Sequence, residues 1–350
     1  MEKETKQSLA DWPNRRLHAV FGSGGTKAVL AGTGAVLAFS VAKLPWDSIG
    51  GASGGSIPAG VLAHGAAPRE FLRHVVDSDF QRLLLPQTGF VGRLLALLRK
   101  YHYESTRPRK GAYGTRLLRR FVNGIVPCWP NNFWTVATCD HGQVLFTKRG
   151  VFKYAAGETV GRLMAPEPPS VGRAVCASCA IPGILDGVPY ADEILFDGAL
   201  SGDGEVPVGV VARHFQAYTA TIVAVDVGEE PLKQARWLRF LWNVFCGGKC
   251  DTSFDGVHPE ERDGLIIIKP ELKGFHALEF ELKRETKWAA VVSGFLATAK
   301  SIDKHALVAP SDALKLRNLV VLLNEVEMSG LKGKQYVAAV ESVLQKQGLL

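Results

Sequence analysis

Blocks of apolar and polar residues along the first part of the chain predict strands that are each followed by a helix. Leu17–Phe21 is a short apolar run, typical of a buried strand, and Ala28–Lys43 has the length and the small residues of a buried helix. The same order recurs with a strand ending at Ser48–Gly50 and a helix that starts after Ser53. Repeated strand–turn–helix units are typical of a parallel α/β sheet.

The pattern continues with elements of both kinds, and no repeat or linker divides the chain. The expected elements are a mostly helical stretch over about 68–125, a hairpin of Phe133–Asp140 with Gln143–Lys148, a helix at Val171–Ala180, strands at Glu193–Phe196, Thr221–Val227 and Leu265–Lys269, and helices at Leu278–Lys300, Ser311–Met328 and Lys334–Lys346. We therefore expect a polar N-terminal segment (1–16), one main α/β domain (17–310) that includes the helical stretch, and a helical C-terminal extension (311–350).

Composition indicates a globular protein with a local concentration of positive charge. Of 350 residues, 47% are hydrophobic, and 41 Lys and Arg exceed 34 Asp and Glu to give a net charge of +7. Between residues 93 and 120 the basic residues are opposed only by Glu104; they are Arg93, Arg99, Lys100, Arg107, Arg109, Lys110, Arg116, Arg119 and Arg120. This cluster fits peripheral contact with an anionic membrane, or equally the solvated face of core helices. We expect no nucleic-acid partner.

The cysteines and the N-terminal residues indicate whether the protein binds a metal and in which cell compartment it is expected. Cys176 and Cys179, with Cys246 and Cys250, have spacings that a four-thiolate zinc site can use, but small buried thiols in an apolar helix explain the first pair better. The first residues resemble no signal peptide, and the apolar run after Ala28 is shorter than the ~20 residues that a membrane span needs. We expect a cytoplasmic protein without a metal.

A candidate nucleophile lies in the second glycine-rich turn. Gly51-Ala52-Ser53-Gly54-Gly55 fits G-x-S-x-G, in which glycines permit a strained strand-to-helix turn that presents a serine hydroxyl. The pattern alone is weakly specific, but here an apolar strand precedes it and a helix follows. The positive end of that helix would favour a serine alkoxide and an acyl-enzyme.

The first glycine-rich turn can supply hydrogen-bond donors for such a serine. Gly22–Lys27 offers consecutive backbone N–H groups at the end of the preceding strand, and Gly24 and Gly25 allow a carbonyl to approach closely. A phosphate-binding loop is the rival interpretation, but G-x-x-x-x-G-K-[ST] is not met. A plain structural turn is the third interpretation.

The serine also needs a base, and the strongest candidate is Asp197. An ordinary α/β-hydrolase uses a histidine late in the chain as its base, and the candidates here are His258, His276 and His305. None of them follows a strand at a glycine-flanked turn. Asp197 does follow a predicted strand, and partial burial would raise its pKa toward neutrality, as a general base requires. Asp203 is the nearby competitor.

Three motifs in order resemble the patatin-like phospholipase family: GSGGTKA (22–28), GASGGS (51–56) and DGA (197–199). AVCASCAIPGIL (174–185) and the segment 274–300 add to the resemblance, which spans about residues 17–300. It implies a three-layer α/β/α sandwich with a mainly parallel central sheet and a Ser–Asp dyad that needs no cofactor. By position, Ser53 is the nucleophile and Asp197 the base. The implied oxyanion donors are Ser23, Gly24, Gly25 and Gly54, and the supporting loop residues are Gly22, Lys27, Gly51, Gly55 and Gly198.

The first loop departs from the family pattern in two places. Lys27 replaces the usual arginine, which keeps the charge but loses the planar fork, and Ala28 replaces a glycine. The N–H groups of the loop are unaffected by either change, so we expect activity to survive.

The resemblance implies a lipid acyl hydrolase acting on phospholipids or lysophospholipids, with peripheral contact to an anionic membrane. Two alternatives stay open. One is a soluble esterase or acyltransferase with the same dyad. The other is a membrane-binding or signalling module with an inactive site, for which Lys27 is the only sequence support. Vesicle binding without release of fatty acid would favour the second.

Overall fold

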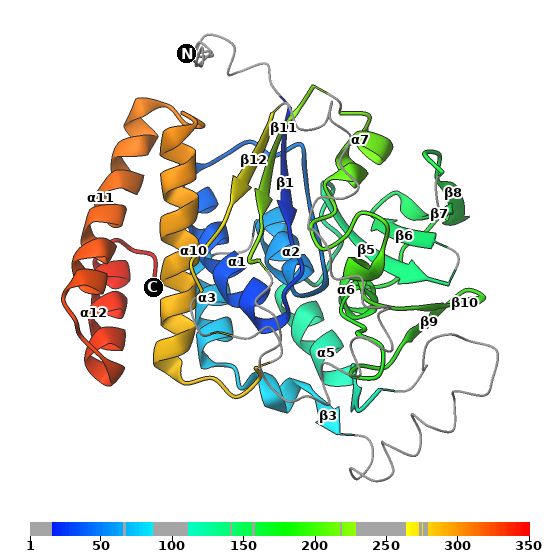
Figure 1. The fold of residues 1–350 in the computed structure, drawn as a ribbon, viewed down its shortest axis with the longest axis horizontal. Coiled ribbons are helices and arrows are strands. Elements are labelled where there is room, and N and C mark those ends of the chain that lie inside the picture. Colours follow the sequence, from blue (N-terminus) through cyan, green and yellow to red (C-terminus); the bar gives the residue numbers. More distant parts are fainter. Residues whose placement is uncertain are drawn as a thin grey trace.

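An eight-stranded sheet forms the centre of the protein (Figure 1). The computed structural model describes residues 16–65, 68–86, 111–140, 142–155, 158–217, 219–228, 264–272, 275 and 279–350. In spatial order the strands are β12 (Leu265–Ile268), β11 (Thr221–Val225), β1 (Leu17–Phe21), β2 (Ser48–Ala52), β5 (Phe133–Cys139), β6 (Gly142–Thr147), β7 (Gly150–Ala155) and β8 (Arg162–Ala165).

The sheet is parallel over the strands that carry the glycine-rich turns. From β12 to β5 all neighbours pair in parallel, whereas β5 to β8 pair antiparallel. The mainly parallel sheet and the β5–β6 hairpin are therefore confirmed. Strands β7 and β8 were not expected, because their polar and apolar positions do not alternate cleanly and β8 has no buried residue.

Helices cover both faces of the sheet and give it three layers. The helices are α1 (Gly25–Ala42), α2 (Ser56–His64), α3 (Pro68–Asp77), α5 (Arg116–Ile125), α6 (Val171–Ser178), α7 (Gly209–Phe215), α10 (Arg284–Lys304), α11 (Pro310–Met328) and α12 (Gly333–Lys346). Short pieces are η2 (Ser53–Gly55), η3 (Phe80–Leu83), η5 (Gly198–Leu200), the pair β3 (Leu85–Pro86) and β4 (Tyr113–Gly114), and the pair β9 (Val188–Tyr190) and β10 (Glu193–Leu195).

Two hydrophobic cores follow from the alternation of side chains along the strands. On β1, Leu17, Ala19 and Phe21 point into the core that α1, α2, α3 and α10 cover, while Val20 points into the core beneath α7. This arrangement of helices, sheet and helix is the expected three-layer sandwich.

Helices α1 and α10 pack so closely that glycines are required at their contact. A Cβ atom at Gly34 would lie 1.9 Å from the carbonyl oxygen of Val291, and one at Gly294 would lie 2.0 Å from that of Ala31. Within the described residues, α1 alone has the length and apolar character to cross a membrane, and 89% of it is buried inside the fold.

The start of α10 corrects the sequence-based expectation of a helix from Leu278. The helix begins at Arg284, because Lys283 before it has an extended backbone. Further back, the hydroxyl of Thr26 donates to the carbonyl oxygen of Glu279 at 2.9 Å. This bond fastens the segment to the first turn of α1. Phe280 is thereby placed on the pocket described below.

The C-terminal helices α11 and α12 pack against the outer side of α10 (Figure 1). Arg284 at the start of α10 donates to Asp77 of α3 at 2.6 Å and to Glu341 of α12 at 2.8 Å. The boundaries proposed for the domain and its extension stay predictions. The stretch 68–125 contains α3 and α5 with the β3–β4 pair between them; its residues 87–110, with most of the basic cluster, lie outside the described residues.

Candidate active site

Ser53 lies at the carboxyl end of β2, in the middle of the parallel strands. The chain passes directly from β2 through η2 into α2, so the serine stands at a strand-to-helix turn. Its φ of 50° is in the left-handed region, which a non-glycine residue adopts rarely and at some energetic cost. Only 2% of its surface is exposed. Gly51 lies within β2, one residue before its end, and Gly55 belongs to η2.

The two glycine-rich turns touch each other through their backbones. A Cβ atom at Gly54 would lie 2.2 Å from the carbonyl oxygen of Gly25, and one at Gly55 would lie 2.2 Å from that of Gly22. Both distances are far below van der Waals contact. The start of α1 is therefore held directly against the turn that carries Ser53.

We expect Gly54→Ala to lower activity at least about 100-fold and to reduce the free energy of unfolding by roughly 2–4 kcal/mol. The added methyl group collides with backbone that cannot rotate away. Ester hydrolysis and urea unfolding measure the two effects. Gly60→Ala, on α2, is the matched control, since the nearest atoms to its Cβ atom would be side-chain atoms of Phe133 at 3.4 Å and Val126 at 3.7 Å. Equal behaviour of the two variants would contradict the argument.

Asp197 lies beside Ser53 although 144 residues separate them in the sequence. The Ser53 hydroxyl donates to Asp197 Oδ2 at 2.7 Å, and the Ala199 N–H donates to Oδ1 at 2.9 Å. Burial raises the pKa of Asp197 from 3.8 to about 7, against the opposing effect of these two hydrogen bonds. A carboxylate with a pKa near neutrality can accept a proton at the pH of the cell.

Neighbouring residues outside the predicted site hold the backbones of Ser53 and Asp197 in place. The Ser53 N–H donates to Ser178 Oγ at 2.8 Å, at the end of α6. The Thr138 hydroxyl of β5 donates to the carbonyl oxygen of Asp197 at 2.9 Å, and the Asp197 N–H donates to that of Ala180 at 3.0 Å. Ser178 and Ala180 belong to the 174–185 segment of the family resemblance, whereas nothing in the sequence distinguished Thr138.

The first glycine-rich turn is placed against Ser53, but one of its expected donors is occupied. The Gly22 N–H donates to the carbonyl oxygen of Val225 and the Ser23 N–H to that of Glu205, both at 2.8 Å. Ser23 is therefore removed from the expected oxyanion donors. Gly24, with φ 141°, leads into α1 at Gly25, and the first N–H groups of a helix have no partner within it.

Lys27 has a structural position in the first turn of α1. The side chain is 3% exposed, and its Nζ donates to the carbonyl oxygen of Gly228 at 3.2 Å, just beyond β11. It is absent from the residues that line the pocket around Ser53. The lysine that departs from the family pattern thus fastens α1 to the loop after β11.

The other candidates lie elsewhere. Asp203 is bonded to Arg213 and Gln143 and not to Ser53. His305 is at the end of α10, and His258, His276, Cys246 and Cys250 lie outside the described residues. In the described part of the chain no three His, Cys, Asp or Glu side chains gather as metal ligands. Burial raises the pKa of Cys176 to about 12 and that of Cys179 well above its usual range.

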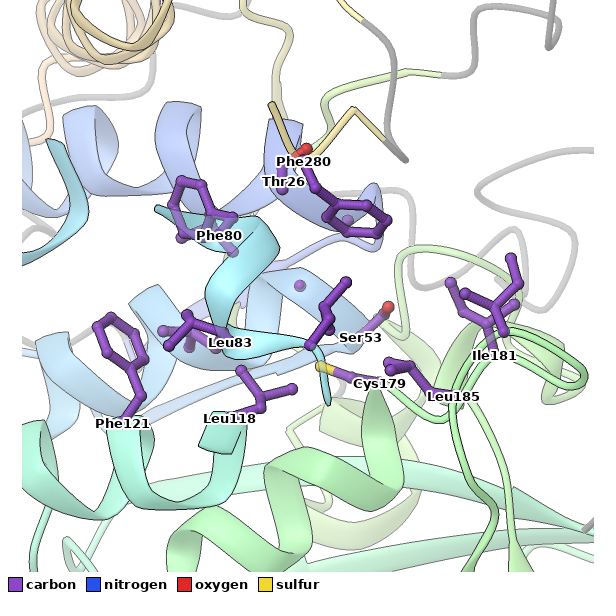
Figure 2. A pocket seen from close by; sticks show the side chains of 16 residues that line it. Thr26, Ser53, Phe80, Leu83, Leu118, Phe121, Cys179, Ile181, Leu185 and Phe280 are labelled. Atoms are coloured by element: carbon purple, nitrogen blue, oxygen red, sulfur yellow. The ribbon is translucent and has the colours of Figure 1, made fainter. Parts of the chain in front are cut away.

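An apolar pocket opens onto Ser53 (Figure 2). Figure 2 shows Leu83, Leu118 and Phe121 on one side of the serine, Ile181 and Leu185 on the other, and Cys179 next to it. The remaining lining residues are Gly25, Thr26, Val29, Gly54, Ile57, Phe80, Leu84, Ile184 and Phe280. Such a lining suits a hydrocarbon chain, because burial of apolar surface is favourable and the walls offer few polar partners.

Comparison with known proteins identifies the family. The patatin-like phospholipase family matches residues 19–211, more than half of the chain, and the chain belongs to this family. Membership supports lipid acyl hydrolase activity. A search of the curated proteins found no match.

Two solved structures resemble the chain at low identity. VipD from Legionella pneumophila is 13% identical with a TM-score of 0.44, over 97% of this chain and 82% of that one. The type III effector protein ExoU is 14% identical with a TM-score of 0.40, over 96% of this chain and 60% of that one.

Proposed function

We propose that the protein is a serine hydrolase that cleaves the carboxylic esters of phospholipids or lysophospholipids. The observation that carries the proposal is the Ser53–Asp197 hydrogen bond of 2.7 Å beside an apolar pocket. A hydroxyl bonded to a buried carboxylate of near-neutral pKa is an activated nucleophile, and the pocket suits the acyl chain that the nucleophile would attack.

The proposed reaction uses an acyl-enzyme. Ser53 Oγ attacks the ester carbonyl while its proton passes to Asp197, and the oxyanion is stabilised by backbone N–H groups of Gly24, Gly25 and Gly54. Asp197 then protonates the leaving alcohol as the tetrahedral intermediate collapses. A water molecule gives a proton to Asp197 as it attacks the acyl-enzyme. Asp197 then returns this proton to the leaving Ser53 Oγ, which releases the fatty acid and regenerates the free serine and the carboxylate.

The side chains of helix α5 support the proposal that the protein acts at a membrane surface. Leu118 and Phe121 line the pocket, while Arg116, Arg119 and Arg120 on the same helix are exposed. Basic side chains near a surface are attracted to anionic lipid by about 1 kcal/mol each. Contact of this helix with the membrane would bring the pocket close to the acyl chains of the substrate.

The central test is fatty-acid release from dioleoyl phospholipid vesicles, combined with labelling by a fluorophosphonate. We expect release, and a label on Ser53 in the peptide mass spectrum. Hydrolysis of p-nitrophenyl butyrate without phospholipid cleavage would instead support an esterase for soluble substrates. Vesicle binding with neither release nor label would support a module without turnover.

The pocket makes a prediction about acyl chains. Leu118→Trp should lower kcat/KM for p-nitrophenyl dodecanoate about 10-fold while changing that for the butyrate less than about threefold, since each lost methylene contact is worth ~0.8 kcal/mol. The ratio of the two rates is the measurement. Leu117→Trp, on the same helix but outside the pocket lining, is the control. A proportionate loss on both esters would show that the pocket does not hold the acyl chain.

A further inference from the structure

A single loop connects the proposed base to the first glycine-rich turn (Gly22–Lys27), called the oxyanion turn below. After Asp197 the chain forms η5 and continues to Val206 without a regular element. At the far end of this loop, the carbonyl oxygen of Glu205 accepts the Ser23 N–H at 2.8 Å. Val206 packs on Gly22, with Cγ2 2.8 Å from where a Cβ atom of residue 22 would lie. Both halves of the site therefore depend on where residues 197–206 lie.

The middle of the loop is fastened by a buried polar cluster. Asp203 is 3% exposed; its Oδ2 pairs with the Arg213 guanidinium of α7 and accepts from Gln143 Nε2 of β6 at 2.8 Å. The same Gln143 nitrogen donates to Ser201 Oγ at 2.9 Å, and Gln143 Oε1 accepts from Arg213 at 3.2 Å. The loop is thus bonded at two points to the sheet and to the helix behind it.

Stabilising the loop does not by itself explain these hydrogen bonds, because forming them costs free energy. A loop that contains Gly198, Gly202 and Gly204 loses much conformational entropy when it is fixed, and burying a charged aspartate costs more. Asp203 and Gln143 do not line the pocket, so neither side chain is placed to touch substrate. What they fix are the two ends of the loop, at Asp197 and at Glu205.

We infer that Asp203, Gln143 and Arg213 are positioning residues. They hold the base Asp197 and the oxyanion turn in the correct positions relative to Ser53. This inference rests on the proposed function. A displacement of about 1 Å in such a site can cost about 100-fold in rate, since the reacting groups must be aligned before the reaction begins. The effect should fall on kcat, because the pocket that binds the acyl chain is formed by other elements.

Three variants test the inference in the full chain. Asp203→Asn and Gln143→Leu should each lower kcat at least 10-fold with KM changed less than twofold, and should slow fluorophosphonate labelling of Ser53 to the same degree. Arg213→Lys keeps the charge but loses the forked donor, so it should show a smaller loss in the same direction. If the other two variants do not fold, kcat and the labelling rate of Arg213→Lys still test the inference.

Glu193→Gln is the matched control. It breaks the partly buried Lys153–Glu193 ion pair between β7 and β10, which lies outside the loop. A lower melting temperature with unchanged kcat is expected for it. Variants of the cluster that lose stability but keep kcat within twofold would overturn the inference. A wild-type chain that neither hydrolyses esters nor takes the label would instead refute the proposed function.

Discussion

Ser53→Ala should abolish ester hydrolysis, lowering kcat by about 10³-fold or more, because no other nucleophile is bonded to the proposed base. Among the described residues, the carboxylate of Asp197 accepts a side-chain hydroxyl only from Ser53. Cys179 lies beside the serine in the pocket, but burial raises the pKa of its thiol well above the usual range, so at neutral pH it is a poor nucleophile. Hydrolysis of p-nitrophenyl butyrate by the purified variant is the measurement.

Two controls make the loss of activity interpretable. The variant should keep its melting temperature to within a few degrees, since the alanine Cβ atom occupies the place of the serine Cβ atom and one hydrogen bond of about 1 kcal/mol is lost. Ser293→Ala, on α10, should leave activity unchanged; its hydroxyl bonds only the Glu271 carbonyl among the contacts described. Retention of more than a tenth of the activity in Ser53→Ala would exclude the proposed nucleophile.

The sequence predicted the parts of the fold and site that depend on local pattern. Apolar runs ending in glycine-rich turns located β1 and β2, and the turn residues identified Ser53 without any tertiary information. Asp197 was proposed because it follows a strand at an open turn. Its position beside Ser53, across 144 residues, is a tertiary fact that only the fold supplies. The catalytic roles of both residues stay predictions.

What the sequence could not predict depends on contacts between distant segments. Ser23 lies in the glycine-rich turn as expected, but its N–H is used by Glu205, about 180 residues further along the chain. Helical periodicity placed the start of α10 too early, because nothing local reveals the bond from Thr26 to Glu279. Lys27 likewise gained a structural explanation only from its bond to Gly228.

Asp203 illustrates the same limit. On sequence it was the nearby competitor for the base, although its SGDGE context looks more like a loop. The structure pairs it with Arg213, a strong donor that leaves Asp203 no role as an acceptor for Ser53. Burial raises the pKa of Asp197 beside Ser53, whereas Asp203 is held in an ion pair with Arg213. The two carboxylates are therefore suited to different tasks.

Asp197→Asn should lose nearly all activity and yet gain stability above neutral pH. The folded-state pKa of Asp197 is raised to about 7 from 3.8, so between these values the folded chain keeps a proton that the unfolded chain has lost. Stability therefore falls as the pH rises through this window. At pH 8 the penalty is on the order of 4 kcal/mol, and asparagine, which does not ionise, avoids it.

The measurement is urea unfolding of both proteins at pH 4 and pH 8. We expect the two to agree to within about 1 kcal/mol at pH 4 and the variant to be more stable by roughly 1–3 kcal/mol at pH 8. Wild-type kcat/KM should rise with pH around 7 as the base loses its proton, and the variant should be about 10³-fold slower throughout. The buried Asp226 is the control: it pairs with Lys269 at 3.5 Å, so Asp226→Asn should lower stability. A variant at residue 197 that is less stable than wild type at pH 8 would show that the carboxylate is stabilised in the fold, and a base of raised pKa would then be excluded.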